Sequence, residues 1–92
     1  MNGKGLNRSW RVIVADCVRK QIRRFPRGYA AKIRRAIDEM EDNPFLGDIR
    51  KLSGEQNVFR RRVGNFRVIF EVLSRERVVL IYDIRRRTSS TY

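Results

Sequence analysis

The sequence predicts an α+β fold with the element order β-α-α-β-β-β. Apolar residues recur at helical spacing in the first half of the chain and alternate at strand spacing in the second half. Gly64-Asn65 lies between two β-rich runs, which is typical of a hairpin turn. We therefore expect two N-terminal helices packed on one face of a mostly antiparallel four-stranded sheet. Residues 1–92 are interpreted as a single domain, with a flexible start at 1–8.

A short strand and two helices are expected first. The run at 10–14, W-R-V-I-V, predicts the strand, and Asp16 is expected to cap the helix that follows. Pro26 and Gly28 separate this helix from the next one, which should end at Asn43-Pro44. The apolar stripes that identify the two helices are Val18, Ile22 and Phe25, then Tyr29, Ile33, Ile37 and Met40.

The remaining strands follow a predicted loop at 45–57. Hairpin strands are expected at 58–63 and 66–73, and a polar turn leads to a last strand at 77–84. This last strand contains the run V-V-L-I, which is apolar on both faces. It is therefore expected inside the sheet rather than at an edge.

Composition and charge narrow the classes of function. A net charge of +12 predicts attraction to nucleic acid, to an anionic membrane or to an acidic protein. No apolar run approaches the roughly 20 residues that span a bilayer, so no membrane partner is expected. Histidine is absent and Cys17 is the one cysteine, which excludes an intramolecular disulfide, an ordinary zinc site and histidine catalysis. We expect no metal, no cofactor and a reducing cytoplasm, with Cys17 packed as a small apolar residue.

Arginines in the hairpin are the strongest candidates for a binding site. Side chains alternate along a strand, so Arg60 and Arg62 share one face and Arg61 takes the other. A hairpin in register would bring Arg67 onto the face of Arg60 and Arg62. The planar fork of arginine suits bidentate contact with phosphate. Arg61 falls where a core residue is expected, so it should reach solvent at the sheet rim or pair with an acid.

Other charged residues leave alternatives open. The run at 85–87 is either an electrostatic tail or the end of a strand in which Arg87 lies beside Arg67. Tyr92 is either a frayed terminus or a platform for a base. Glu55, Glu71 and Asp83 are candidate acids or salt-bridge partners, and Glu71 should orient Arg67. The helical arginines are interpreted as solvated surface: Arg19, Arg23, Arg24, Arg34 and Arg35.

Two stretches resemble the RelE/ParE superfamily of bacterial and archaeal toxins. They are K-L-S-G…F-R-R-R-V-G-N-F-R-V-I-F-E-V, from Lys51, and V-V-L-I-Y-D-I-R-R-R followed closely by a tyrosine. The match extends back through both helices. The resemblance implies a RelE-like fold and a toxin of a type II toxin–antitoxin pair. In the RelE branch the toxin enters the ribosomal 30S A site and cuts mRNA without a metal.

The resemblance also implies roles for residues. Arg60 and Arg62 would lie near the attacking 2′-hydroxyl, and Arg67 would steady the phosphate. Arg87 would stabilise charge or protonate the leaving oxygen, and Tyr92 would stack on a base. Such a site works by positioning and charge stabilisation. The implied partners are an acidic cognate antitoxin and the ribosome with mRNA, with the free toxin a monomer and the antitoxin complex a larger assembly.

The chain departs from RelE where the general base is needed. RelE has lysines at the positions of Arg60 and Arg62, and arginine stays protonated, so the proton acceptor is unassigned. The loop arginine of RelE falls on Ser53, near Arg50 and Lys51. We expect RNA contacts from Arg50, Lys51, Arg85 and Arg86. Two alternatives remain, a ParE-like inhibitor of DNA gyrase and a non-catalytic homologue that binds only RNA or its antitoxin.

Overall fold

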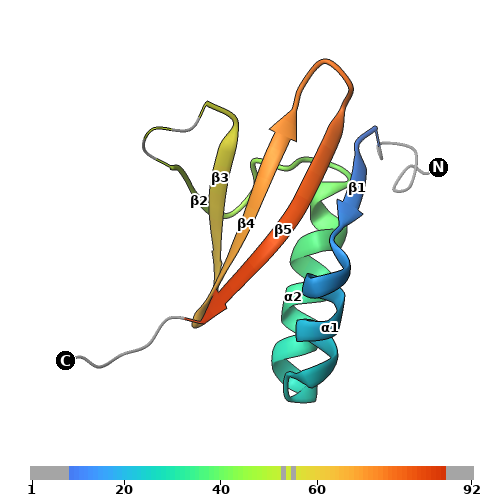
Figure 1. Cartoon of the computed structure of the whole chain (residues 1–92), viewed down its shortest axis with the longest axis vertical. Coiled ribbons are helices and arrows are strands. Elements are labelled where there is room, and N and C mark those ends of the chain that lie inside the picture. The colour runs from blue at the N-terminus through green and yellow to red at the C-terminus, as the bar shows by residue number, and fades with distance from the viewer. Residues whose placement is uncertain (1–8, 53, 55, 87–92) are drawn as a thin grey trace.

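The computed structural model describes residues 9–52, 54 and 56–86. Within this part the elements are β1 (Arg11–Val14), α1 (Asp16–Arg24), α2 (Arg27–Met40), β2 (Asp48–Lys51), β3 (Val58–Val63), β4 (Phe66–Leu73) and β5 (Val78–Arg86). The strands form one sheet in the order β1-β5-β4-β3-β2 (Figure 1). β1 is parallel to β5, and the other neighbouring strands are antiparallel. The predicted α+β class and the mostly antiparallel sheet are confirmed.

One face of the sheet, here called the inner face, packs against both helices. Val68 and Phe70 of β4 are fully buried together with Ile33 of α2 and Val18 of α1. These are positions that the two apolar periodicities predict, and burying them supplies the main stabilisation of a small domain. The opposite, outer face carries no helix among the described residues (Figure 1). It is therefore free to present side chains.

The sequence misses one strand. Residues 48–51 were expected in a loop, but they form β2 and pair with β3, which makes the sheet five-stranded. The prediction of four strands is wrong because β2 has only one apolar residue, Ile49, and lies at the edge of the sheet. An edge strand of this kind is defined by the hydrogen bonds of its partner rather than by its own pattern.

Two local predictions at the start of α1 are also wrong. Ala15, not Asp16, is at the N-cap, and no side-chain hydrogen bond caps this helix. Asp16 is the first helical residue, where its charge favours the positive end of the helix dipole. Cys17 is exposed rather than packed, and its Sγ donates a hydrogen bond to the Tyr82 carbonyl of β5 at 3.9 Å. The break between the helices is as predicted, with Pro26 at the N-cap of α2.

Strand β5 has the predicted interior position, between β4 and β1. It runs two residues further than expected, to Arg86. Its register against β4 shifts between Ile69, which pairs with Asp83, and Phe70, which pairs with Ile81. Tyr82 is thus the additional residue of a β-bulge, a device that re-aims the side chains that follow it.

Candidate active site

The three hairpin arginines share the outer face. Arg62 of β3 lies directly opposite Arg67 of β4, and Arg60 lies opposite Ile69, two residues further along β4. Paired residues of neighbouring strands point to the same side of a sheet, so all three side chains leave the outer face. The geometric prediction for Arg60, Arg62 and Arg67 is confirmed.

A fourth arginine joins them from β5. Arg85 lies directly opposite Arg67, so Arg62, Arg67 and Arg85 form one row across three strands. The bulge at Tyr82 makes this row possible. Regular alternation from buried Val79 and Ile81 would send Asp83 and Arg85 to the inner face, whereas the shifted register sends both outward and buries Ile84 instead.

Burial at this site is uneven. Arg62 and Arg85 are exposed, whereas Arg60 and Arg67 are half-buried. The Nε atoms of Arg60 and Arg67 are buried, and no residue of the described chain accepts a hydrogen bond from them. Ile69 lies between these arginines on the outer face and is only 6% exposed. Two Nε donors on this face are thus shielded from solvent without an acceptor in the described chain, a state that favours an anionic ligand.

Asp83 is the acid that contacts this arginine row. Its Oδ2 accepts a hydrogen bond from Arg85 Nε at 2.9 Å, in a pair that is largely exposed. Glu71 shares the outer face but lies opposite Val58, and it forms no ion pair with Arg67 within the described chain. The prediction that Glu71 orients Arg67 is therefore wrong, because the register sets Glu71 two residues beyond Ile69, away from the row.

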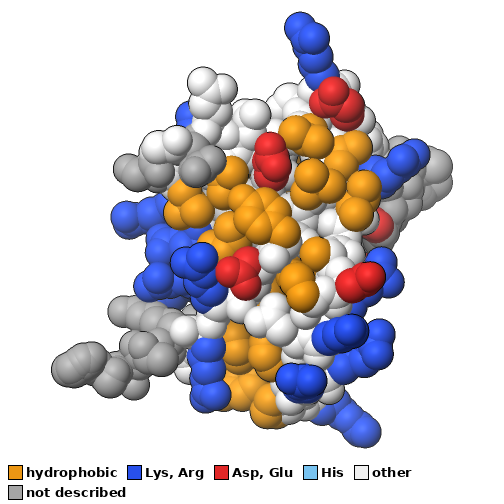
Figure 2. Space-filling view, in the orientation of Figure 1, with side chains coloured by type: hydrophobic (Ala, Val, Ile, Leu, Met, Phe, Trp, Pro, Cys, Tyr) orange, Lys and Arg blue, Asp and Glu red, His pale blue; other side chains and the backbone are white. Residues whose placement is uncertain are grey.

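The remaining candidates divide between the faces. Arg50 pairs with Arg60 and belongs to the outer face, whereas Lys51 pairs with Phe59 and Arg86 pairs with Phe66 on the inner side. All three side chains are exposed at the sheet margin. Figure 2 shows Lys and Arg side chains grouped beside an apolar patch on the visible face. Arg87, Tyr92, Ser53 and Glu55 lie outside the described residues.

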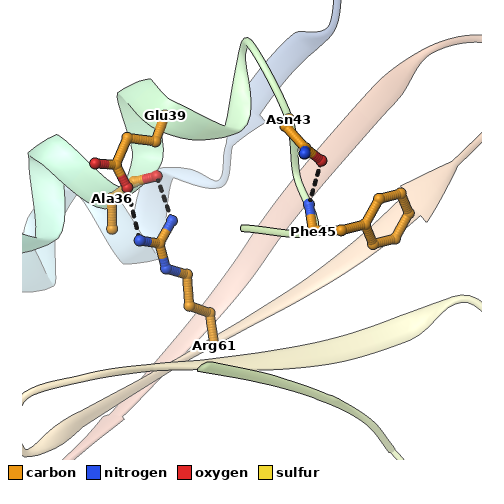
Figure 3. A network of polar contacts seen from close by, with 5 residues as sticks. All are labelled: Ala36, Glu39, Asn43, Phe45 and Arg61. Carbon is orange, nitrogen blue, oxygen red and sulfur yellow. Dashed lines mark hydrogen bonds and ion pairs between the residues drawn. The ribbon is translucent and has the colours of Figure 1, made fainter. Parts of the chain in front are cut away.

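Arg61 binds the helix layer instead of solvent. Its side chain points inward from β3, where its two terminal nitrogens donate to Glu39 Oε1 at 2.6 Å and to the Ala36 carbonyl at 3.2 Å (Figure 3). The Arg61 side chain is 12% exposed. Of the two alternatives predicted for Arg61, the pairing with an acid is the one observed. The sequence could not name Glu39, because the two residues are brought together only when α2 packs on β3.

Two further observations concern metal binding and membrane-spanning helices. In the part of the chain that the structure describes, no group of three His, Cys, Asp or Glu residues could hold a metal ion. No described helix is long and apolar enough to cross a membrane.

Comparison with known proteins identifies the family. A family model for the ParE toxin of type II toxin–antitoxin systems, parDE, matches residues 7–90. This chain belongs to the RelE/ParE superfamily of toxins. A Methanocaldococcus jannaschii protein that carries the name toxin RelE1 is 34% identical over 73 residues, covering 76% of this chain and 81% of that protein. The chain is thus a RelE-type toxin of a type II toxin–antitoxin system.

Solved structures agree with this fold. The RelE–RelB complex of Pyrococcus horikoshii is matched with a TM-score of 0.80 and 25% identity, over 89% of this toxin and 99% of that chain. The isolated RelE toxin of E. coli is matched with a TM-score of 0.74 over 88% of this toxin and 87% of that chain. At 14% identity, the second likeness concerns the fold alone.

Proposed function

We propose that this toxin is a ribosome-dependent endoribonuclease that cuts mRNA in the A site without a metal. The observation that carries the proposal is the convergence of four arginines, Arg60, Arg62, Arg67 and Arg85, on the outer face. A half-buried arginine whose Nε donor has no partner lowers the folding stability of the free protein. A phosphate oxygen would accept a hydrogen bond from such a donor. A surface that only had to be soluble would not need them.

The reaction is an internal transfer at phosphorus. The 2′-oxygen of a nucleotide attacks the adjacent phosphate, the bond from phosphorus to the 5′-oxygen breaks, and the products are a 2′,3′-cyclic phosphate and a 5′-hydroxyl. Negative charge grows on the phosphoryl oxygens during this step. Arg67 holds those oxygens, and Arg60 and Arg62 hold the nucleotide that carries the attacking hydroxyl. Charge stabilisation of this kind can supply the largest share of a rate enhancement.

The proton of the 2′-hydroxyl needs an acceptor other than arginine. Asp83 is held against Arg85 at 2.9 Å and lies diagonally across from Arg67, because Asp83 pairs with Ile69 and Arg85 pairs with Arg67. We assign proton acceptance to the Asp83 carboxylate. Arg87 protonates or stabilises the leaving 5′-oxygen, and Tyr92 stacks on a base.

The proposed partners follow from charge and from the relatives. Related RelE chains were crystallised with RelB, and a chain of charge +12 favours an acidic partner. We therefore propose an acidic cognate antitoxin that covers the basic outer face in a larger assembly. The free toxin is a monomer in the cytoplasm, where the ribosomal 30S A site and its mRNA are its target.

Cell-free translation with primer extension on the mRNA tests the proposed function. Wild-type toxin should stop translation and produce cuts within codons at the ribosomal A site, and Arg67→Ala should abolish the cuts. Intact mRNA with normal translation in the presence of folded wild-type toxin would contradict the proposal.

A second candidate is a ParE-like inhibitor of DNA gyrase, which the matched family model favours. Such an inhibitor does not need a convergent phosphate site. Gyrase supercoiling in the presence of the toxin separates the two, because a nuclease of the RelE type leaves supercoiling unchanged. A homologue that binds RNA but cuts nothing would leave both translation products and supercoiling unaltered.

A further inference from the structure

An open cavity lies between helix α2 and strand β3. Its volume is about 210 Å³, and basic side chains from both elements line it, namely Lys32, Arg35, Arg61 and Arg62. Glu39 is the acid among its lining residues. The helical side of this cavity was interpreted from the sequence as solvated surface, but the packing of α2 on β3 brings it next to the strand arginines.

The charges in this cavity are not balanced. Glu39 is already occupied, because its Oε1 accepts the 2.6 Å hydrogen bond from Arg61. Within the described chain, Lys32, Arg35 and Arg62 form no ion pair. Lys32 and Arg35 lie three residues apart on α2, so they project from neighbouring positions of one helical face. Lys32, Arg35 and Arg62 are therefore exposed cationic groups without an ion pair in the described chain, with Asp48 opposite Arg62 in the strand register.

Arg62 connects this cavity with the proposed active site. It leaves the outer face opposite Arg67, yet it also lines the cavity. The pairing of β2 with β3 stops at Arg62, which pairs with Asp48, so the edge of β3 is open at Val63. A bound RNA strand that leaves the outer face can pass this open edge of the sheet and reach α2 without crossing another β-strand.

We propose that this cavity is a second phosphate site, in which Lys32, Arg35 and Arg62 bind an RNA backbone phosphate adjacent to the one held by Arg67. The inference rests on the proposed function for the identity of the first site. Arginine offers a planar fork of donors and lysine a point charge, and both are common contacts for phosphate. The small volume and the sharing of Arg62 favour a phosphodiester over an acidic peptide helix.

Binding of a non-cleavable oligonucleotide tests the proposal apart from catalysis. The probe is a fluorescent single-stranded oligonucleotide in which hydrogen replaces every 2′-hydroxyl, so that it cannot be cut, and it is titrated with toxin at several NaCl concentrations. The variant is Lys32→Ala with Arg35→Ala, two exposed helical positions at which alanine favours the helix. The matched control is Lys20→Ala with Arg24→Ala, which removes the same charge from exposed positions of α1 outside this cavity.

The double variant in the cavity should lose at least tenfold in affinity at low salt, and the control less than about threefold. The slope of log affinity against log salt should become shallower by about 0.7 for the one lost phosphate. Equal losses in both variants would overturn the proposal, since charge alone would then explain binding. The proposal would also be overturned if the wild-type toxin did not bind the probe. It would be overturned as well if the cavity variant lost binding to the antitoxin while its affinity for the probe stayed unchanged.

The second phosphate site and the proposed nuclease can be tested independently of each other. If wild type cuts no mRNA but the cavity variant still loses affinity selectively, the second phosphate site stands and the nuclease does not. If wild type cuts mRNA and the cavity variant binds and cuts normally, the nuclease stands and the second site does not. Circular dichroism of both double variants is recorded as the check that they are folded.

Discussion

Arg61 on the inner face of β3 is joined to Glu39 of α2 by a 2.6 Å ion pair. The same guanidinium donates to the Ala36 carbonyl at 3.2 Å, so one side chain ties the strand to the helix at two points (Figure 3). The neighbours of Arg61 in sequence, Arg60 and Arg62, face outward into the proposed active site. One strand thus carries the ligand-facing arginines on one side and its own attachment to the helix layer on the other.

Replacing Arg61 by alanine should destabilise the fold. The change removes a part-buried ion pair and leaves the Ala36 carbonyl without its donor, at a cost of about 2 kcal/mol. Urea unfolding followed by circular dichroism measures this loss. Arg62→Ala is the matched control on the same strand, because Arg62 is exposed and ion-paired with no described residue. Equal stability of the two variants would show that the pair with Glu39 contributes nothing.

Gly47→Ala should also destabilise the fold, because the added methyl group would crowd the Arg61 side chain. Gly47 has φ of +84°, and a Cβ there would lie 2.7 Å from Arg61 Nε. Gly54→Ala is the control, since Gly54 has φ of +81° with nothing within 4 Å of its Cβ. The control should show only the backbone cost of about 1 kcal/mol, and Gly47→Ala should exceed it. If the excess persists in an Arg61→Ala background, the crowding has another cause.

Arg67→Met should increase stability while abolishing cleavage. The substitution keeps an aliphatic stem beside Ile69 and removes a buried Nε donor that lacks an acceptor in the described chain. A gain of about 1 kcal/mol corresponds to a rise in Tm of roughly 4–8 °C for a domain of this size. Arg85→Met is the control, because Arg85 is exposed and should change Tm little. A fall in Tm for Arg67→Met would show that Arg67 is structural.

Asp83→Asn should separate proton transfer from binding. Loss of the carboxylate should slow mRNA cleavage by about 10²-fold or more, the usual contribution of a general base. Affinity for the deoxy probe should rise a few fold, since Arg85 is released from its 2.9 Å pair and the net charge increases. Asp48→Asn is the control, as Asp48 lies opposite Arg62 on the same face. Equal cleavage by the Asp83 and Asp48 variants would remove Asp83 from the mechanism.

The periodicity of apolar residues was sufficient to predict most helices and strands. It was insufficient where a neighbouring strand or helix defines the local structure. The hairpin strands β3 and β4 were predicted at their observed bounds because two β-rich runs flank the turn at Gly64-Asn65. β2 was missed because a strand with one apolar residue has no pattern of its own. The ion pair of Arg61 with Glu39 was anticipated in kind, but its partner lies 22 residues away and is selected by packing.

By itself the sequence determined the fold class, the two helices, the hairpin and the common face of Arg60, Arg62 and Arg67, because each depends on local side-chain period. The tertiary structure alone decided that Asp83 and Arg85 join that face. A bulge at Tyr82 reverses the alternation of β5, and strict alternation from Ile81 would have predicted the opposite side. The bulge depends on how β5 pairs with β4, which no local pattern in β5 specifies.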